Sequence, residues 1–472
     1  MALDTIYLGL EDVLFSFSNF IWGIPLVALL VGSGIMFALY SRFRPYKYLP
    51  HAFNVLIGKY DSQTDKGQIS HFQALATALS GTIGLGNIVG VALGISVGGP
   101  GVLFWMWVTA LVGMITKFYT CSLSIMYRGR DSLGVIQGGP MYVIREGLSR
   151  KWLPLAWLFA FAGVCGSLPV FQVNQLVQIL KDVFLNSGSH ATTTGDLWFS
   201  LSVGVIVGIV VLTIILGKIQ RVGFFSAKIM PCIVLVYLIM TIGLLVKFYE
   251  KVPMAFSLIL NEAFSGEAVM GGGLISVILI GVRRGAISNE AGIGTESMAH
   301  GAARTNEPIR EGLVAMFGPI IDTFLVCTCT GLAIIVTDSW KLNLSGISVT
   351  TSAFELAYPG YGAILLMLVV IFFSISTMTT FWYYGTKCLG FLVGAKHQFH
   401  YTWLYFILII VGSVSTLNIV LGLIDSMYAL MAIPTMVSTI FLAKKVNQEF
   451  YRYKDKYLRH DFQNNIICDV KN

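Results

Sequence analysis

One stretch of the sequence restricts the fold more than any other, the run from Ser80 to Gly90, which reads Ser-Gly-Thr-Ile-Gly-Leu-Gly-Asn-Ile-Val-Gly. It lies in a long apolar segment, yet three glycines within six residues weaken the helix where it should be most regular. Unwound backbone in hydrocarbon has no water to bond, so it persists only where protein encloses it or where it lines a polar cavity. The run therefore predicts an interrupted membrane helix that forms half of a solute site.

A second interrupted apolar segment follows about 205 residues later, from Gly285 to Thr295. Each segment contains Gly-X-Gly beside Asn or Thr, as Gly84-Leu85-Gly86-Asn87 and as Gly292-Ile293-Gly294-Thr295. Paired breaks in corresponding halves indicate a transporter built from two structural repeats. The alternative for the first run is a helix-packing ridge, because glycines recur there every four residues, at Gly86, Gly90, Gly94 and Gly98.

The composition is that of a polytopic membrane protein. The 472 residues are 56% apolar and only 12% charged, whereas soluble domains carry about 25% charged residues. The net charge of +7 does not indicate nucleic-acid binding, because Lys and Arg are spread over many loops. The seven cysteines are scattered and predict neither a disulfide framework nor a metal site. The expected partner surface is therefore a lipid bilayer.

Eleven apolar windows are long enough to cross a bilayer. Of the 31 Lys and Arg residues, 24 fall on one side of these windows, four on the other and three within them. Because cytoplasmic loops are rich in Lys and Arg, this predicts an outer N-terminus and an inner C-terminus in the cell membrane. Acidic residues before the first window argue against a cleaved signal peptide. The windows are 20–40, 72–97, 101–127, 154–180, 197–216, 224–248, 270–299, 312–336, 360–385, 402–418 and 420–443.

The eleven windows divide into one extra helix and two groups of five. The extra helix lies in 1–45, the first repeat in 72–248 and the second in 268–443, followed by a basic cytoplasmic tail, 444–472. A repeat of five spans inverts its orientation relative to the next, and each repeat then begins with its broken helix. The predicted fold is an all-α, five-plus-five inverted repeat.

The breaks also predict where a substrate binds. One half-helix presents free N–H groups and a positive dipole end to the cavity, and the other presents free carbonyls. The first end suits a carboxylate, and the second suits a cation or an ammonium group. Backbone at Thr82, Gly84, Leu85 and Gly86, with the Asn87 side chain as donor or orienter, is expected at the carboxylate. Oxygens at the ammonium are expected from Ser288, Asn289 and Gly292.

A sodium site needs hard oxygen ligands, and window 360–385 offers several hydroxyls within one helical turn or two. Ser376, Thr377 and Thr380 share a helix face, and the backbone at Gly81 and Thr82 adds oxygens. The alternative is that these hydroxyls bond back to their own helix.

Charged residues within membrane windows are costly and are therefore candidates for function. Glu290 is expected to bind an ion or to hold the unwound backbone. Asp322 and Lys117 are expected to form a gate or brace, paired with each other or with loops. Arg283 and Arg284 are expected near the inner face as a gating pair, and Asp425 at the interface. Gln172 and Asn174 are polar positions that face either the solute path or their own helix.

These residues resemble one known family, the alanine/glycine:cation symporters. The resemblance is carried by motifs that follow in order along most of the chain, among them Gly81-Thr82-Ile83-Gly84, Gly98-Gly99-Pro100-Gly101, Gly138-Gly139-Pro140-Met141-Tyr142, Ser288-Asn289-Glu290-Ala291-Gly292 and Leu430-Met431-Ala432-Ile433-Pro434. It implies a leucine-transporter-like core and Na+- or H+-driven uptake of a small neutral amino acid such as alanine or glycine.

The chain departs from that family at three positions. Leu85 stands where the family has Thr, Phe381 where it has Trp, and Thr386 where it has Glu. Leu85 and Phe381 belong to the expected substrate pocket, so the departures bear on which amino acid is carried.

The sequence as a whole predicts a secondary transporter, with Na+ or H+ as the coupling ion. No HExxH, nucleophile elbow, Walker or dinucleotide motif occurs, so we expect neither an enzyme nor a bound cofactor. We expect a monomer. The alternatives are the same mechanism with another neutral amino acid, a passive channel, or a sensor on the same helices.

Overall fold

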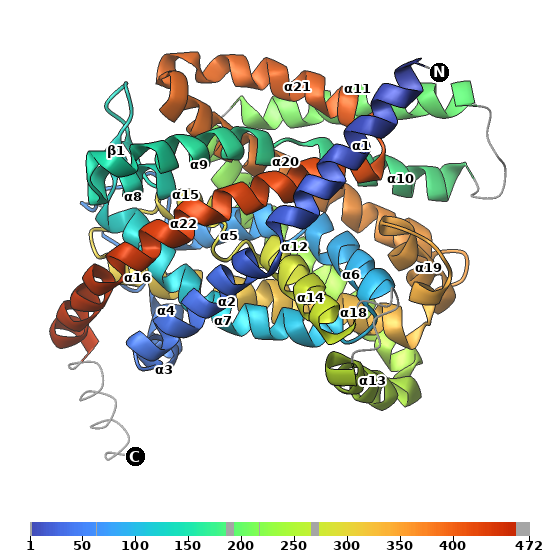
Figure 1. The fold of residues 1–472 in the computed structure, drawn as a ribbon, viewed down its shortest axis with the longest axis horizontal. Helices are drawn as coiled ribbons and strands as arrows, with labels where there is room; N and C mark the ends of the chain where they lie inside the picture. The colour runs from blue at the N-terminus through green and yellow to red at the C-terminus, as the bar shows by residue number, and fades with distance from the viewer. Residues whose placement is uncertain (1, 63, 186–192, 217, 266–272, 459–472) are drawn as a thin grey trace.

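The computed structural model describes residues 2–62, 64–185, 193–216, 218–265 and 273–458, and most of them are helical (Figure 1). The start of the expected second repeat, 268–272, and the end of the expected tail, 459–472, lie outside the described residues. The strands of the described chain, β1 (Gly129–Arg130) and β2 (Ile136–Gln137), form one antiparallel hairpin.

The first half of the chain contains α1 (Ala2–Ile21), α2 (Ile24–Tyr40), α3 (Arg44–Lys47), α4 (Leu49–Leu56), α5 (His71–Thr82), η1 (Gly86–Gly90), α6 (Val91–Gly98), α7 (Val102–Met126), α8 (Pro140–Gly147), η2 (Arg150–Trp152), α9 (Leu153–Gly166), α10 (Val170–Phe184), α11 (Thr193–Ile215), α12 (Lys218–Lys247), η3 (Tyr249–Lys251) and α13 (Val252–Ser265). The second half contains α14 (Gly273–Asn289), α15 (Thr295–His300), α16 (Pro308–Ala315), α17 (Phe317–Pro319), η4 (Ile320–Cys327), α18 (Thr328–Val336), η5 (Ser339–Lys341), α19 (Ile347–Ala357), α20 (Gly362–Val393), η6 (Ala395–His397), α21 (Gln398–Val414), α22 (Leu417–Tyr453) and η7 (Lys454–Leu458).

Seven helices of the described chain are long and apolar enough to cross a membrane, and nine if each of two bent pairs is one span. The bent pairs are α1 with α2, at 41°, and α5 with η1 and α6, at 48°. Helices α14 and α21 have 17 residues each and fall just short of that length. The predicted count of eleven spans therefore stays a prediction, while the polytopic, mostly helical architecture is evident.

The first expected break is present. Helix α5 begins with a capping box, in which Ser70 and Gln73 satisfy each other's backbone N–H groups, and it ends at Thr82 because Ile83 is extended (φ −78°, ψ 109°). The chain resumes at Gly86 as the π-helix η1 before it returns to the α form in α6. π-Helical turns often occur at functional sites.

The second expected break separates α14 from α15. Gly292 (φ +86°) and Gly294 (φ +100°) adopt the left-handed conformation that glycine takes at no steric cost. Glu290 is also left-handed (φ +55°), which is uncommon for a side chain of its kind and is seen where the surroundings impose it. Both glycines of the predicted Gly-X-Gly motif thus serve the turn itself.

The glycine ridge considered for the first run is also present, but only at its last two glycines, Gly94 and Gly98. A Cβ atom at Gly98 would lie 2.5 Å from Val102 Cγ2, and one at Gly94 would lie 3.3 Å from Arg284 Cγ. At Gly90 a Cβ atom would meet nothing within 4 Å. Close helix packing therefore accounts for Gly94 and Gly98, and the break accounts for the glycines before them.

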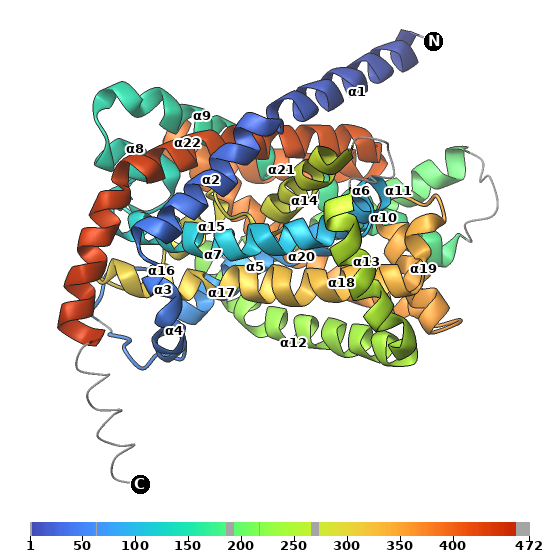
Figure 2. The same ribbon diagram turned by 60° about the horizontal axis from the view of Figure 1, so that its bottom comes forward.

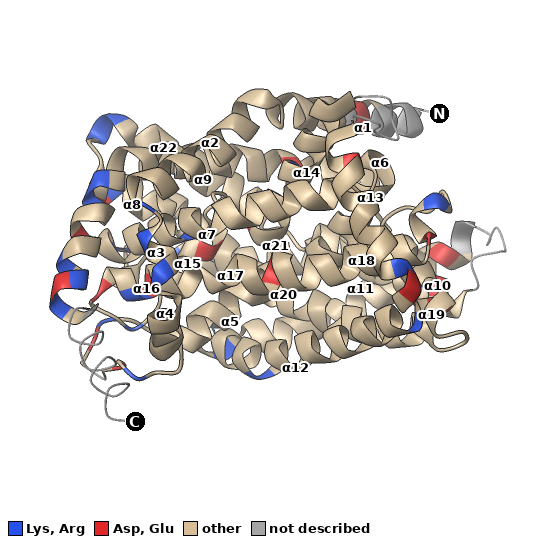
Figure 3. Ribbon diagram, turned by 90° about the horizontal axis from the view of Figure 1, so that it is seen from below, with Lys and Arg blue, Asp and Glu red and all other residues tan. Residues whose placement is uncertain are grey.

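Helix α20 lies at the centre of the molecule, where it contacts α5, α9, α10, α12 and α21. The N-terminal helix α1 projects from one end, and the C-terminal end of α22 lies at the other (Figure 2). Figure 3 shows Lys and Arg gathered at the end formed by α3, α8, α16 and the last turns of α22. We refer to this as the basic end.

The tight contact between α16 and α7 provides a test of the packing. A methyl group at Gly312 would collide with the Ser122 hydroxyl and would lie 2.6 Å from the carbonyl oxygen of Phe118. We expect Gly312→Ala to destabilise the protein by about 1–3 kcal/mol, the usual cost of overpacking. Thermal unfolding in detergent measures this, and Gly90→Ala, which adds the same methyl group in open space, is the matched control. Equal unfolding temperatures for the two variants would contradict the packing.

Candidate substrate and cation site

Two asparagines attach the two breaks to one dipeptide of η4, Asp322-Thr323. Asn87 Oδ1 accepts a hydrogen bond from the Gly84 N–H (3.0 Å), and its Nδ2 donates to the carbonyl of Asp322 (3.2 Å). Asn289 repeats this arrangement, because its Oδ1 accepts from the Ala291 N–H (3.0 Å) and its Nδ2 donates to Thr323 Oγ1 (3.3 Å). Both asparagines are fully buried. Each one satisfies a backbone donor of its own break and fixes that break against η4.

Ser288 makes a further contact between the second break and η4. Its hydroxyl donates to Asp322 Oδ1 (3.0 Å) and lies 3.1 Å from Cys327 Sγ, which is also 3.3 Å from Asn87 Nδ2. A Cβ atom at Gly86 would lie 3.9 Å from Ser288 Cα, so the two breaks lie side by side. The other carboxylate oxygen, Asp322 Oδ2, is buried and has no hydrogen-bond partner among the described residues. A buried carboxylate oxygen that lacks a hydrogen-bond partner is unusual in proteins. It is expected to bind a ligand or a proton.

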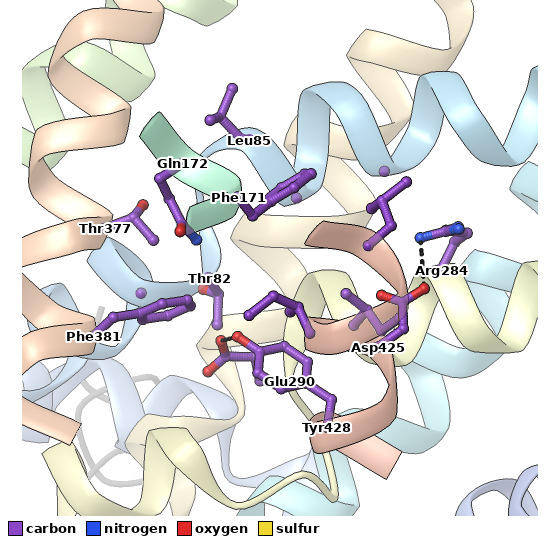
Figure 4. Close-up of a pocket in the computed structure, with 16 residues that line it drawn as sticks. Thr82, Leu85, Phe171, Gln172, Arg284, Glu290, Thr377, Phe381, Asp425 and Tyr428 are labelled. Carbon is purple, nitrogen blue, oxygen red and sulfur yellow. Dashed lines mark hydrogen bonds and ion pairs between the residues drawn. The ribbon is translucent and has the colours of Figure 1, made fainter. Parts of the chain in front are cut away.

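A cavity of about 40 Å³ lies beside this contact (Figure 4). Both breaks, α10, α20 and α22 contribute to its wall, and Figure 4 shows Gln172, Thr377 and Phe381 facing Thr82 and Glu290 across it. The lining residues are Gly81, Thr82, Leu85, Gly86, Gly90, Phe171, Gln172, Arg284, Ile287, Glu290, Thr377, Phe381, Leu421, Ile424, Asp425 and Tyr428.

The structure divides the residues expected at the substrate into three groups. Those that line the cavity are Thr82, Leu85, Gly86, Gln172 and Phe381. Those in the supporting layer behind it are Gly84, Asn87, Ser288 and Asn289. Gly292 does neither, because a Cβ atom there would meet Leu30 at 2.7 Å and Met436 at 2.8 Å. A side chain at Gly292 would therefore face α2 and α22, and the expected role of its backbone oxygen at the ammonium stays a prediction.

The hydroxyls expected at the sodium ion lie along the interface between α20 and α5. Ser376 Oγ is 2.6 Å from Ser80 Oγ, and Thr380 Oγ1 donates to the same Ser80 oxygen at 3.0 Å. Bonding back to the helix occurs at Thr379, which donates to the Ser376 carbonyl at 2.8 Å. Thr377 Oγ1 lines the cavity and is buried without a partner. Among the described residues, Ser374 Oγ one turn earlier on α20 also has no partner, but of the two only Thr377 lines the cavity.

The arginine pair forms an ion pair, as expected, and its partner is Asp425. Arg283 Nη2 is 2.7 Å and Arg284 Nη1 is 3.4 Å from Asp425 Oδ2, and Arg283 also donates to Ser18 and Asn19 of α1. Asp425 is buried near the start of α22, at the opposite end of that helix from its basic residues. Because α14 runs toward the basic end, its arginines lie on the other side of the break from that end. The inner-face position of the arginines and the interfacial position of Asp425 stay predictions.

The remaining charged residues near the breaks are buried. Glu290 lines the cavity and accepts hydrogen bonds from Thr295 and from the Tyr428 hydroxyl (3.3 Å). Lys117 is buried on α7, where a Cβ atom at Gly318 would lie 3.0 Å from its Nζ. The ion pairs among the described residues include none between Lys117 and Asp322, the direct pair that we considered.

Sequence reasoning missed the wall contributed by α22. Leu421, Ile424, Asp425 and Tyr428 recur at helical spacing and face the cavity together. The signal was present, since Asp425 is a charged residue within an apolar helix and Tyr428 lies one turn after it. Asn174, by contrast, donates to the Ser415 carbonyl (2.5 Å) and does not line the cavity.

Comparison with known proteins agrees with this geometry. The family model described as the sodium:alanine symporter family matches residues 8–466. The chain belongs to the sodium:alanine symporter family. As a member it is a multi-pass membrane transporter of the cation-coupled amino-acid type.

Relatives of this symporter span almost its whole length. It is 37% identical to an uncharacterized transporter of Haemophilus influenzae, over 97% of this chain and 99% of that one. It is 35% identical to the sodium/alanine symporter AgcS of Methanococcus maripaludis, over 92% of this chain and 94% of that one. The crystal structure of MhsT in complex with L-phenylalanine has a similar fold, with a TM-score of 0.56 and 12% identity over 82% of this chain and 99% of MhsT.

The two asparagines give a direct test of the site. In Asn87→Ala or Asn289→Ala, a backbone N–H of the break and an acceptor on η4 lose their partner, which costs about 1–3 kcal/mol for each buried group. We expect amino-acid uptake into proteoliposomes to fall at least tenfold while the purified protein still elutes as a single species. Asn261→Ala removes an exposed amide on α13 and should transport normally. Normal kinetics in both site variants would refute the placement of the site.

Proposed function

We propose that this chain is a secondary active symporter that imports a small neutral amino acid of the alanine and glycine class together with Na+. The observation that carries the proposal is the attachment of both breaks to Asp322-Thr323 beside a cavity lined by both. Broken helices that meet at mid-membrane are the usual binding site of transporters built from repeats. Support for the substrate class comes from the family and from AgcS, named a sodium/alanine symporter.

In this proposal the substrate carboxylate binds at the start of η1. The first N–H groups of a helix have no partner within it and carry the positive end of the dipole, and Leu85 and Gly86 present that end to the cavity. The ammonium group binds opposite. Gln172 Oε1 is buried without a hydrogen-bond partner, and the Glu290 carboxylate lies on the same wall. The cavity thus offers a donor end and an acceptor end to a zwitterion.

Two places suit the coupling ion. The first is at Thr377 Oγ1, close to Gly84, where backbone oxygens near Gly81 and Thr82 complete a set of hard ligands. The second is at Asp322, whose buried Oδ2 has no partner and which stands between Ser288 and Asn87. The second place also suits a proton. The Asp322 carboxyl is therefore the group that favours H+ coupling as the alternative.

The proposal includes the membrane arrangement predicted from the sequence. Eleven spans with an outer N-terminus place the basic end in the cytoplasm, and the two groups of five form inverted repeats. The first repeat's broken helix then moves with its counterpart against a scaffold that includes α20. The concentration of Lys and Arg at one end supports this orientation (Figure 3).

Uptake under imposed gradients tests the coupling. We expect radiolabelled alanine to accumulate in proteoliposomes under an inward Na+ gradient and not under an equal K+ gradient, with other neutral amino acids ranked by competition. Accumulation driven by a pH gradient alone would select H+ instead. Uptake that neither saturates with amino acid nor responds to any cation gradient would exclude symport and favour a passive channel.

Asp322→Asn separates the two coupling ions. The amide keeps the shape of the side chain but loses the charge, so we expect at least a tenfold rise in the Na+ concentration that gives half-maximal uptake, which corresponds to about 1.4 kcal/mol. If Asp322 carries a proton instead, the variant should lose the pH dependence of uptake with its Na+ response unchanged. Asp338→Asn, which removes a half-exposed carboxylate on the surface, is the control. An unaltered Na+ response and pH profile in Asp322→Asn would remove Asp322 from the coupling mechanism.

A further inference from the structure

A second cavity, of about 620 Å³, lies at the basic end of the molecule. Its wall comes from the hairpin β1–β2, which leads into α8, and from the end of α11, the start of α12, the end of α20 and the start of α21. Among the described residues, none lines both this cavity and the substrate cavity of about 40 Å³. The larger volume lies in the usual range of ligand pockets, roughly 300–1,000 Å³, and exceeds what a small amino acid fills. We refer to it as the basic-end cavity.

Two ammonium groups stand at this cavity, because Lys387 of α20 and Lys396 of η6 both line it. Lys387 Nζ lies 5.3 Å from the centroid of the Tyr383 ring, one turn earlier on α20. This cation–π contact holds the ammonium at the wall without neutralising it. The ion pairs among the described residues include none of either lysine. Both charges are therefore available to an anion.

The carboxylate among the described lining residues, Asp131, is already used by the hairpin. Its Oδ1 accepts hydrogen bonds from the N–H groups of Leu133 (2.9 Å) and Val135 (3.0 Å), and its Oδ2 accepts one from the Gln137 side chain (2.8 Å). These bonds fix the turn of the hairpin. The described lining thus carries two positive charges against one negative charge, and the negative one is directed at donors of the hairpin itself. An excess of positive charge in a hollow with apolar walls favours an anionic ligand.

Lysines near the end of a membrane helix often extend to water, and that is the alternative explanation for this pair. It accounts for Lys396, which is exposed. It does not account for Lys387, which lies six residues before the end of α20 at Val393 and is only partly exposed. At a rise of 1.5 Å per residue, this position is about 9 Å inside the helix end. The ammonium of Lys387 is therefore reached through the cavity rather than at the end of the helix.

The rim of the basic-end cavity is apolar and exposed. Leu133 of the hairpin is 58% exposed, Leu216 after α11 is 60% exposed, and Phe399 of α21 is 57% exposed. The hairpin is held beside α21 because the Ala395 N–H donates to Ser132 Oγ (2.8 Å). Exposed apolar side chains that gather from separate elements mark a surface that contacts lipid or a partner. In a membrane transporter, such a rim beside two ammonium groups matches a lipid with an acidic headgroup.

We propose that the basic-end cavity binds one anionic phospholipid from the adjacent leaflet, with its phosphate at Lys387 and Lys396. An acyl chain of that lipid lies along Leu133, Leu216 and Phe399. Basic pockets between membrane helices suit acidic headgroups for the same electrostatic reason. A free anion would use the lysines and leave the rim exposed, whereas a zwitterionic lipid would bring its own ammonium group next to two others. The inference goes beyond the proposed function, because it concerns another site and is the same for any transported amino acid.

Binding of radiolabelled dioleoylphosphatidylglycerol tests the proposal without any transport. The full chain is immobilised in dodecyl maltoside, and bound label is followed by scintillation proximity. The unlabelled competitors are dioleoylphosphatidylglycerol, dioleoylphosphatidylcholine, inorganic phosphate and alanine. We expect one saturable site, competition by phosphatidylcholine that is at least tenfold weaker than that by phosphatidylglycerol, and no displacement by millimolar phosphate or alanine.

The two lysines are tested with Lys387→Gln combined with Lys396→Gln, for which we expect at least tenfold weaker binding of phosphatidylglycerol. The matched control, Lys444→Gln with Lys445→Gln, removes the same charge from exposed positions of α22 and should bind normally. Thr386→Glu keeps both lysines but adds a carboxylate to the wall beside Lys387, so it should weaken binding by a similar factor. It takes the place of the double lysine variant if thermal unfolding shows that the latter does not fold.

Equal affinity for phosphatidylglycerol in the lysine variant, in its control and in Thr386→Glu would overturn the site. Equal competition by phosphatidylcholine would show that the headgroup is not selected, and displacement by phosphate would show an anion site without a lipid. Displacement by alanine would make the cavity part of the solute path. Each of these results contradicts the proposal, and none of them removes the proposed symport.

Discussion

The structure depends on how unwound backbone is satisfied away from water. Each break frees N–H and C=O groups that would cost several kcal/mol apiece if they were buried without partners. The Gly84 N–H is bonded by Asn87 and the Ala291 N–H by Asn289, and both amides then bond Asp322-Thr323. The same two asparagine side chains therefore stabilise both breaks and attach them to one dipeptide. The polar groups around Leu85, Gly86 and Gln172 are not used in these bonds. They are the groups to which the proposed function assigns a zwitterionic solute.

Much of this was accessible from the sequence, for physical reasons that differ between residues. The breaks were predictable because glycine in an apolar helix has a definite cost and a definite use, and both breaks occur where Gly84, Gly86, Gly292 and Gly294 indicated. The pairing of the breaks was predictable from their order in the chain. The role of Asn87 was foreseen only in part, because a side chain that orients its own turn leaves the same sequence signal as one that binds a ligand.

Other features of the site required the fold. The contacts of the breaks with Asp322-Thr323 of η4 bring together residues more than 230 positions apart, such as Asn87 and Asp322. No local sequence pattern indicates such a contact. Arg283 and Arg284 were expected to form an ion pair, but their partner Asp425, 142 and 141 positions away, could not be identified from the sequence. Gly292 was assigned to the substrate by its motif, yet its positive φ already explains why glycine is there, and its Cα faces Leu30 and Met436. A motif identifies a break more reliably than it identifies which atoms of that break face the ligand.

The departures from the family pattern acquire a physical meaning in the cavity wall. Leu85 and Phe381 both line the cavity, so a hydroxyl and an indole N–H are absent from the places where the family has Thr and Trp. Trp382 does not replace the indole, because its N–H donates to Thr402 of α21 and so points away from the cavity (3.1 Å). Phe381 instead packs edge-on against Tyr428, with ring centroids 6.5 Å apart. If the cavity binds an amino acid as proposed, it has fewer side-chain donors and uses main-chain N–H groups at η1 to hold the carboxylate, a group common to every amino acid. In that proposal, selection among amino acids falls to the apolar wall, where the volume left by Leu85, Phe171 and Phe381 limits the size of the side chain that can bind.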